Sequence, residues 1–166
     1  MLQPLRRKIW APVGQTPIDY PWNRRDRLSV MCALTVAPWA DRFGLYYDLL
    51  HHNCHAVDVI RFLQTIHHKL RRTMLVIWDR LQAHRSAATQ LAQAGCPWLE
   101  PRWLPAYAPE LDPVEFVWTQ AKYGDMANWV PDDIHDLQNH LQQHLEDYRH
   151  DPVRLYSFFR IARLPI

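Results

Sequence analysis

The run Met74–Trp78 restricts the fold more than any other segment, because its five residues are all apolar and show no alternation. A strand with one face in water alternates apolar and polar side chains, whereas a strand covered on both faces is a continuous apolar run. Such strands are typical of parallel sheets, whose neighbouring strands are joined by helices. The run therefore predicts an α/β fold in which this strand is buried on both faces and ends at Asp79.

The segments on either side of this run alternate between strand and helix patterns. Residues 28–36 and Phe43–Leu50 are apolar runs joined by a short link, which indicates an antiparallel pair. Between residues 53 and 72, apolar side chains recur every three or four positions, as on one face of a helix. Similar patterns predict strands at residues 98–104 and 7–10, and helices at residues 86–94, 112–123, 131–148 and 152–163. This order predicts a mixed sheet flanked by helices.

The amino-acid composition indicates the class of fold but leaves most functions open. A chain of 166 residues, 48% of them hydrophobic, is typical of one globular domain. A net charge of +2 neither requires nor excludes a nucleic-acid partner. Cys32, Cys54 and Cys96 form no CxxC pair, so we expect reduced thiols and no zinc site. No apolar run suits a membrane span or a signal peptide, so we expect a cytoplasmic protein without a membrane partner.

Two carboxylates stand where a site at the sheet edge would form. Asp79 follows the apolar run directly, and sites of open α/β sheets lie outside the carboxyl ends of the strands. The residues between Asp79 and Glu115 hold one helix and one strand, which can return the chain to the same edge. Two carboxylates there would suit Mg²⁺ and phosphodiester chemistry. Other interpretations stay open: Asp79 as a loop or capping residue, and Glu115 as the end of a capping box begun by Asp112, with Pro113 at the first helical position.

The sequence around these two residues resembles a known family. The matching pieces are residues 6–17 (RRKIWAPVGQTP), 76–80 (VIWDR), 84–86 (HRS), 104–118 (LPAYAPELDPVEFVW) and Lys122. Together they resemble the DDE catalytic domain of mariner-like bacterial insertion-sequence transposases, over residues 5–125. The most specific stretch contains the motif positions Tyr107, Pro109, Asp112, Pro113 and Trp118.

The resemblance implies an RNase H-like fold and a metal-dependent DNA strand transferase. On it, Asp79 matches the second catalytic aspartate and Glu115 the final glutamate, and both would bind Mg²⁺ or Mn²⁺. The implied partners are DNA, as transposon ends and target, and a second copy or a full-length transposase. Residues 1–125 would then be the catalytic domain, and residues 126–166 a helical extension of the same domain.

The sequence departs from the family pattern in two places. Asp112 stands where the family usually has Asn, and its negative charge near Glu115 could raise that carboxyl's proton affinity or tighten a metal. The first catalytic aspartate should precede Trp10, yet residues 1–18 contain no Asp or Glu. Asp19, Asp48 and Asp58 do not stand at the position of that first catalytic aspartate.

We therefore expect a sheet without its central first strand, no helix-turn-helix, and a chain that alone neither cuts nor joins DNA. A decayed remnant, a late start or a frame-split gene would explain this, and we favour the first two.

Several further side chains have two interpretations each. The cations Arg80, Arg85, Arg102 and Lys122 could hold DNA phosphates, or form a solvated rim, which we favour for each alone. His84 could orient a phosphate or a water near Asp79, or be structural. We expect Tyr107 and Trp118 to pack rather than stack on bases. His140 and His144 are spaced for chelation, but a polar helix face is favoured.

Two rival functions remain beside strand transfer. One is an RNase H-like nuclease acting on RNA or DNA hybrids, which the stretch at residues 105–115 disfavours. The other is a non-catalytic module that binds DNA or dimerises with a full-length transposase. The missing first aspartate favours this second alternative over the first.

Overall fold

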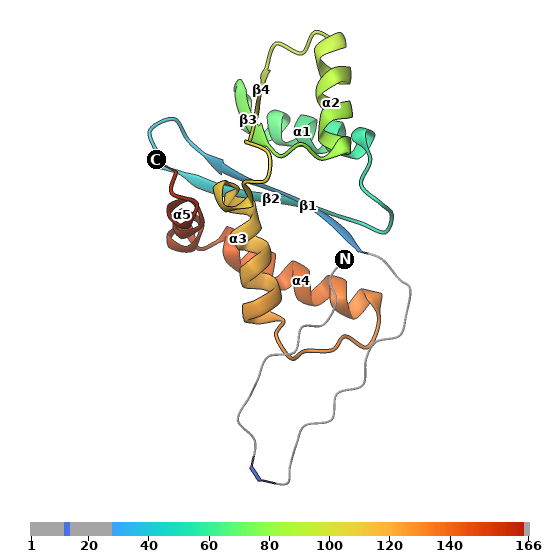
Figure 1. Cartoon of the computed structure of the whole chain (residues 1–166), viewed down its shortest axis with the longest axis vertical. Coiled ribbons are helices and arrows are strands. Elements are labelled where there is room, and N and C mark those ends of the chain that lie inside the picture. The colour runs from blue at the N-terminus through green and yellow to red at the C-terminus, as the bar shows by residue number, and fades with distance from the viewer. Residues whose placement is uncertain (1–11, 14–27, 165–166) are drawn as a thin grey trace.

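The computed structural model describes residues 12–13 and 28–164, and Figure 1 shows the arrangement of their elements. The strand predicted at residues 7–10 lies outside this part. The elements in chain order are β1 (Ser29–Val36), β2 (Phe43–Leu50), α1 (Ala56–Leu70), β3 (Met74–Trp78), α2 (Gln82–Gln93), β4 (Leu99–Trp103), the 3₁₀ turn η1 (Pro109–Leu111), α3 (Pro113–Thr119), the π-helical turn η2 (Gln120–Asp125), α4 (Ile134–Arg149) and α5 (Pro152–Ile161).

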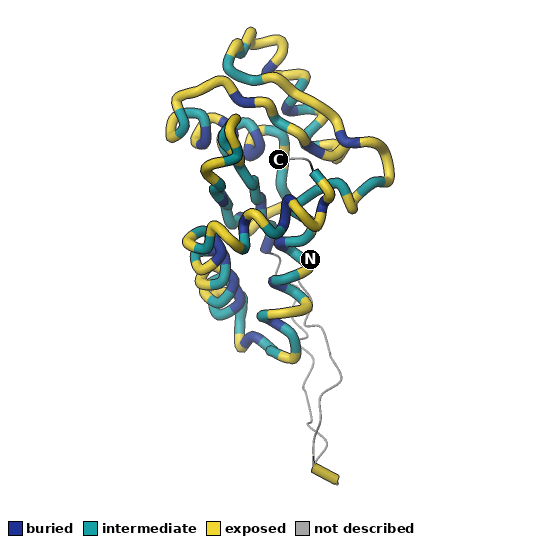
Figure 2. Tube along the Cα trace, turned by 90° about the vertical axis from the view of Figure 1, so that its left-hand side faces the viewer, coloured by how far each residue is buried: buried dark blue, intermediate teal, exposed yellow. Residues whose placement is uncertain are grey.

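The antiparallel hairpin β1–β2 separates two apolar cores. Its register runs from Ser29↔Leu50 to Val36↔Phe43, so alternate side chains point to opposite faces. One face, which includes Leu45, packs on residues of α3, α4 and α5. The other face, with Met31 and Leu50, packs on residues of α1, β3 and α2. The hairpin therefore lies between two layers (Figure 1), and the buried positions lie on the inner sides of the helices (Figure 2).

The second ladder is the parallel pair β3–β4, in register from Met74↔Leu99 to Trp78↔Trp103. Helices α1 and α2, which precede and follow β3, contact one another beside it. Antiparallel and parallel ladders are thus both present, as predicted for a mixed sheet. Within residues 28–164 no strand joins the two ladders, so the sheet is divided into two two-stranded pieces.

Strand β3 is not buried on both faces, and that prediction was wrong. Met74 and Trp78 are buried in the core with α1 and α2, whereas Leu75 is 58% exposed and Ile77 54% exposed. Both helices attached to β3 pack on the same face, and no described element covers the other. A continuous apolar run shows that a strand has two apolar faces, but it does not show what covers each face.

Two helix boundaries differ from the prediction. Helix α2 begins at Gln82 rather than at residue 86, because residues 82–85 continue the helix instead of forming a loop. Helix α3 ends at Thr119 and continues as the π-helical turn η2 through Asp125. Gly124, the first residue after the predicted helix at residues 112–123, lies inside this turn, where an added Cβ would meet Gln120 Nε2 at 2.5 Å. A larger residue at this position would therefore have to displace the end of the Gln120 side chain.

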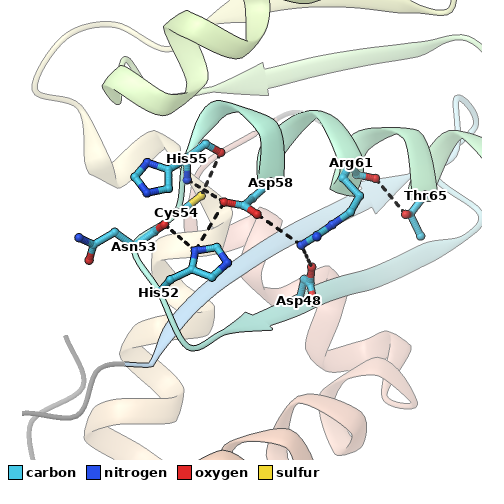
Figure 3. A network of polar contacts seen from close by, with 8 residues as sticks. All are labelled: Asp48, His52, Asn53, Cys54, His55, Asp58, Arg61 and Thr65. Atoms are coloured by element: carbon cyan, nitrogen blue, oxygen red, sulfur yellow. Dashed lines mark hydrogen bonds and ion pairs between the residues drawn. The ribbon is translucent and has the colours of Figure 1, made fainter.

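A polar network fastens the start of α1 to the hairpin (Figure 3). Asp58 is 4% exposed, and its carboxylate accepts a hydrogen bond of 3.0 Å from the backbone N–H of His55. Arg61 Nη2 lies 3.4 Å from an oxygen of Asp58 and 3.4 Å from an oxygen of Asp48 on β2. A buried carboxylate needs such partners to offset its desolvation. Asp48 and Asp58 therefore serve the packing of α1, which agrees with their exclusion as site residues.

No helix in the described part combines the length and the apolar character needed to cross a bilayer.

Two matched substitutions test the placement of the hairpin and of β3. Leu45→Ala removes a side chain that is 1% exposed, and it should lower the free energy of unfolding by about 2–5 kcal/mol. Leu75→Ala makes the same chemical change at a 58% exposed position, and it should cost less than about 1 kcal/mol. Urea unfolding followed by circular dichroism measures both. Equal losses would show that the outer face of β3 is covered.

Candidate functional site

Asp79 lies at the carboxyl end of the parallel ladder, as predicted. It follows Trp78, the last residue of β3, and its side chain is 54% exposed. Its Oδ1 accepts a hydrogen bond of 3.0 Å from the backbone N–H of Leu81 and lies 2.6 Å from His84 Nδ1. The backbone N–H of Leu104 donates to Trp78 O at 2.9 Å, which carries the ladder one residue past β4. The chain that leads to Glu115 therefore departs from beside Asp79.

Glu115 lies in the first turn of α3, and its side chain does not close a capping box. Asp112 caps the helix by accepting a hydrogen bond of 3.0 Å from Val114 N–H, with Pro113 at the first helical position. The backbone N–H of Asp112, which a capping box would give to Glu115, instead donates to Pro109 O at 3.0 Å. The capping interpretation of Glu115 is thus removed, and its exposed carboxylate is available for other contacts.

The surroundings of Glu115 and Asp112 raise the pKa of both carboxyls. Partial burial raises the pKa of Glu115, and the negative charges of Asp112 and Asp79 raise it further, while Lys122 lowers it. Burial likewise raises the pKa of Asp112, the hydrogen bond from Val114 lowers it, and Asp79 raises it. The direction of the Asp112 contribution agrees with the expectation that its negative charge raises the proton affinity of Glu115.

The basic side chains that were predicted to contact DNA phosphates have different surroundings in the structure. Lys122 lies in η2 and acts on Glu115. His84, in the first turn of α2, contacts Asp79 and lowers the pKa of Asp112. Arg80 and Arg85 are exposed on either side of His84 in the sequence. Arg102 is on β4 and forms an ion pair with Glu100, so its guanidinium already has a partner.

The two aromatic residues of the motif, Tyr107 and Trp118, differ in burial. Trp118 is half-buried and packs against the core beneath the hairpin, as expected. Tyr107 is fully exposed, so the prediction that it packs was wrong. It lies in the loop between β4 and η1 with a φ of 60°, a left-handed conformation that is uncommon for tyrosine. The loop turns back toward α3 at this point, which directs the ring outward into solvent.

Aromatic stacking beside Asp79 was not predicted. Trp78 stacks on His84 with ring centroids 5.4 Å apart, and on Trp103 with centroids 5.4 Å apart. Trp78 and Trp103 become neighbours only through the parallel register, which neither residue's local sequence reveals. Their position at the last residue of each strand is the one signal that could have indicated the contact.

The described part of the chain contains no large cluster of metal-ligating side chains. Among residues 28–164 there is no group of three or more His, Cys, Asp or Glu side chains arranged for a metal. His140 and His144 approach with Nε2 atoms 3.1 Å apart, and Trp129 stacks on His140, which makes a pair within a helix face. Mg²⁺ commonly takes one or two carboxylates and completes its shell with water and substrate phosphates. Two carboxylates such as Asp79 and Glu115 would suffice for such a shell, and a cation there would oppose the burial and the negative charges that raise the pKa of Glu115.

Comparison with known proteins identifies the family. A family model described as "DDE superfamily endonuclease" matches residues 1–138. None of the curated proteins compared with the chain matches it. A solved structure described as "Crystal structure of the Mos1 Strand Transfer Complex" is similar, with a TM-score of 0.61 and 17% sequence identity. This match covers 98% of the present chain and 47% of the Mos1 chain, and it establishes the RNase H-like fold. Because the family model covers most of its length, this chain belongs to the DDE superfamily endonucleases.

Proposed function

We propose that this chain is a catalytic-domain segment of a mariner-like DNA transposase, in which Asp79 and Glu115 hold Mg²⁺ or Mn²⁺ against a DNA phosphodiester. One observation carries the proposal. Asp79 follows the last residue of β3, and Glu115 lies in the first turn of α3, the helix that the chain reaches after it leaves β4 beside Trp78. The Mos1 structure is a strand transfer complex, which supports DNA as the substrate class.

A divalent cation bound there would activate a water or a 3′-hydroxyl and stabilise the leaving oxygen. The chain's own residues supply the positions and the charges. Asp79 is held by the N–H of Leu81 and by His84, and Glu115 projects from a helix start that Asp112 caps. The cations Lys122, Arg80 and Arg85 would contact phosphates, which receive most protein–DNA hydrogen bonds. The protein's share is orientation and electrostatic stabilisation of the transition state.

The described site provides two of the three carboxylates that the family resemblance implies. Residues 1–18 contain no Asp or Glu, so the matching position before Trp10 has no carboxylate within these 166 residues. We therefore propose that the 166-residue chain binds the cation but does not cut or join DNA by itself. A role as a non-catalytic DNA-binding or transposase-dimerising module is the alternative.

Metal binding tests the proposed pair directly. Titration with Mn²⁺, followed by the electron paramagnetic resonance of the unbound ion, should show saturable binding. Asp79→Asn and Glu115→Gln should each weaken it about tenfold or more, because each removes one of two anionic ligands. Glu110→Gln, at an exposed glutamate on η1, should bind as the wild type does. Unchanged binding in both site variants would refute the shared cation.

Burial and neighbouring negative charges, which together raise the pKa of Glu115, predict a gain in stability when this residue is neutralised. A carboxyl whose folded-state pKa is raised favours folding below its ordinary pKa, and that contribution is lost as pH rises through the raised value. In metal-free buffer at pH 7, Glu115→Gln should therefore raise Tm by about 1–3 °C, a small value because solvent screens the exposed group.

The difference in Tm between Glu115→Gln and the wild type should depend on pH and on the presence of Mn²⁺. Near pH 4, where carboxyls of ordinary pKa are about half protonated, the difference in Tm between Glu115→Gln and the wild type should shrink. Mn²⁺ should stabilise the wild type more than the variant, because only the wild type keeps both ligands. A Glu115→Gln variant less stable than the wild type at pH 7 without metal would contradict the unfavourable surroundings of the Glu115 carboxylate.

A strand-transfer assay separates the two functions. The purified chain, incubated with Mg²⁺ or Mn²⁺ and labelled DNA carrying candidate terminal repeats, should give no nicked or joined product. Mobility shifts of the same DNA that do not depend on metal would favour the non-catalytic module. Mg²⁺-dependent joining that Asp79→Asn abolishes would overturn the proposed inactivity of the lone chain, while supporting the role of Asp79.

A further inference from the structure

The two oxygens of the Asp79 carboxylate have different surroundings. Oδ1 accepts the backbone N–H of Leu81 at 3.0 Å and lies 2.6 Å from His84 Nδ1. A carboxylate oxygen can only accept, so the contact with His84 is favourable when Nδ1 carries the hydrogen. Within the described part of the chain, no hydrogen bond or ion pair reaches Oδ2. Oδ1 is therefore occupied on the protein side, and Oδ2 is left for another partner.

The His84 ring is itself held in place. It stacks on Trp78 with an interplanar angle of 15°, and Trp78 stacks on Trp103 with an angle of 20°. These three rings form a stacked column across the ends of β3 and β4. Trp78 is 6% exposed and belongs to the core with α1 and α2, so the column rests on a buried side chain. The His84 side chain is 26% exposed, whereas the Asp79 side chain is 54% exposed. The more buried His84 ring therefore restrains the more exposed carboxylate of Asp79.

We infer that His84 is a positioning residue, which donates Nδ1–H to Asp79 Oδ1 and thereby presents Oδ2 as the single oxygen that binds a divalent cation. The inference rests on the proposed metal site. Groups that hydrogen-bond to a metal ligand fix its orientation and commonly change metal affinity 10–100-fold when removed. Asp79 alone could rotate about χ2 and exchange its oxygens, because one Leu81 N–H restrains only one of two equivalent acceptors. The stacked column adds the second restraint through His84.

Three substitutions of His84 distinguish the effect of its hydrogen-bond donor from the effect of the size of its ring. The amide Nδ2 of asparagine occupies nearly the position of histidine Nδ1, so His84→Asn keeps the donor. The amide of glutamine reaches instead to the position of Nε2, so His84→Gln keeps size and polarity but moves the donor away. His84→Ala removes both. His68→Asn is the matched control, because His68 Nδ1 also has a partner, Gln64 O at 2.7 Å, on the exposed face of helix α1.

The measurement is the Kd for Mn²⁺ of each full-length variant at pH 7.5, from the paramagnetic resonance of the unbound ion. Far-UV circular dichroism and thermal unfolding confirm that each variant is folded. We expect His84→Ala and His84→Gln to weaken binding about 10-fold or more, and His84→Asn and His68→Asn to stay within about threefold of the wild type. Equal weakening by His84→Asn and His84→Gln would overturn the positioning role, because only the ring's packing would then matter.

Failure of the inference is distinguishable from failure of the proposed function. If the wild type binds Mn²⁺ and Asp79→Asn abolishes binding, yet every His84 variant binds like the wild type, the metal site stands and the positioning role falls. If the wild type does not bind Mn²⁺, or Asp79→Asn binds as well as the wild type, both fall. Loss of binding in His84→Gln with retention in His84→Asn supports both.

Discussion

The parallel pairing of β3 with β4 is the constraint on which the site depends. It places Trp78 opposite Trp103, and it extends through the hydrogen bond from Leu104 N–H to Trp78 O. Asp79 leaves the end of one strand, and the loop to α3 leaves the end of the other. A shift of this register by one residue would turn Trp103 to the opposite face, break the stacked column and move the start of α3 relative to Asp79. Two strands of five residues each therefore decide where the site's charges lie.

The part of the molecule that stabilises the fold is separate from the part that carries the candidate site. The hairpin β1–β2 is covered on both faces, and Asp58 with Arg61 fastens α1 to it. The carboxyls of Asp112 and Glu115, in contrast, have raised pKa values, because burial and then neighbouring negative charge disfavour their ionised forms. This unfavourable ionisation has a physical reason if a cation binds there, because the free energy of binding then offsets it.

Much of this arrangement could be predicted from sequence, and the errors have identifiable causes. Hydrophobic periodicity located both strands of the hairpin and the helix between β2 and β3, because those patterns extend over many residues. The position of Asp79 followed from the end of an apolar run, and that of Glu115 from its helix start. The exposure of Leu75 and Tyr107 could not be predicted, since it depends on which distant elements cover them. The contact of His84 with Trp78 was equally hidden, because residues 82–85 read as a loop and prove to be helical.

The central claim is that Asp79 and Glu115 share one divalent cation. A crystal structure of the chain grown with Mn²⁺, with anomalous diffraction to locate the ion, tests it most directly. The account predicts an anomalous peak about 2.0–2.2 Å from Asp79 Oδ2 and from a carboxylate oxygen of Glu115, with water completing the shell. A peak bound to only one of these carboxylates, or one located only at His140 and His144, would contradict it.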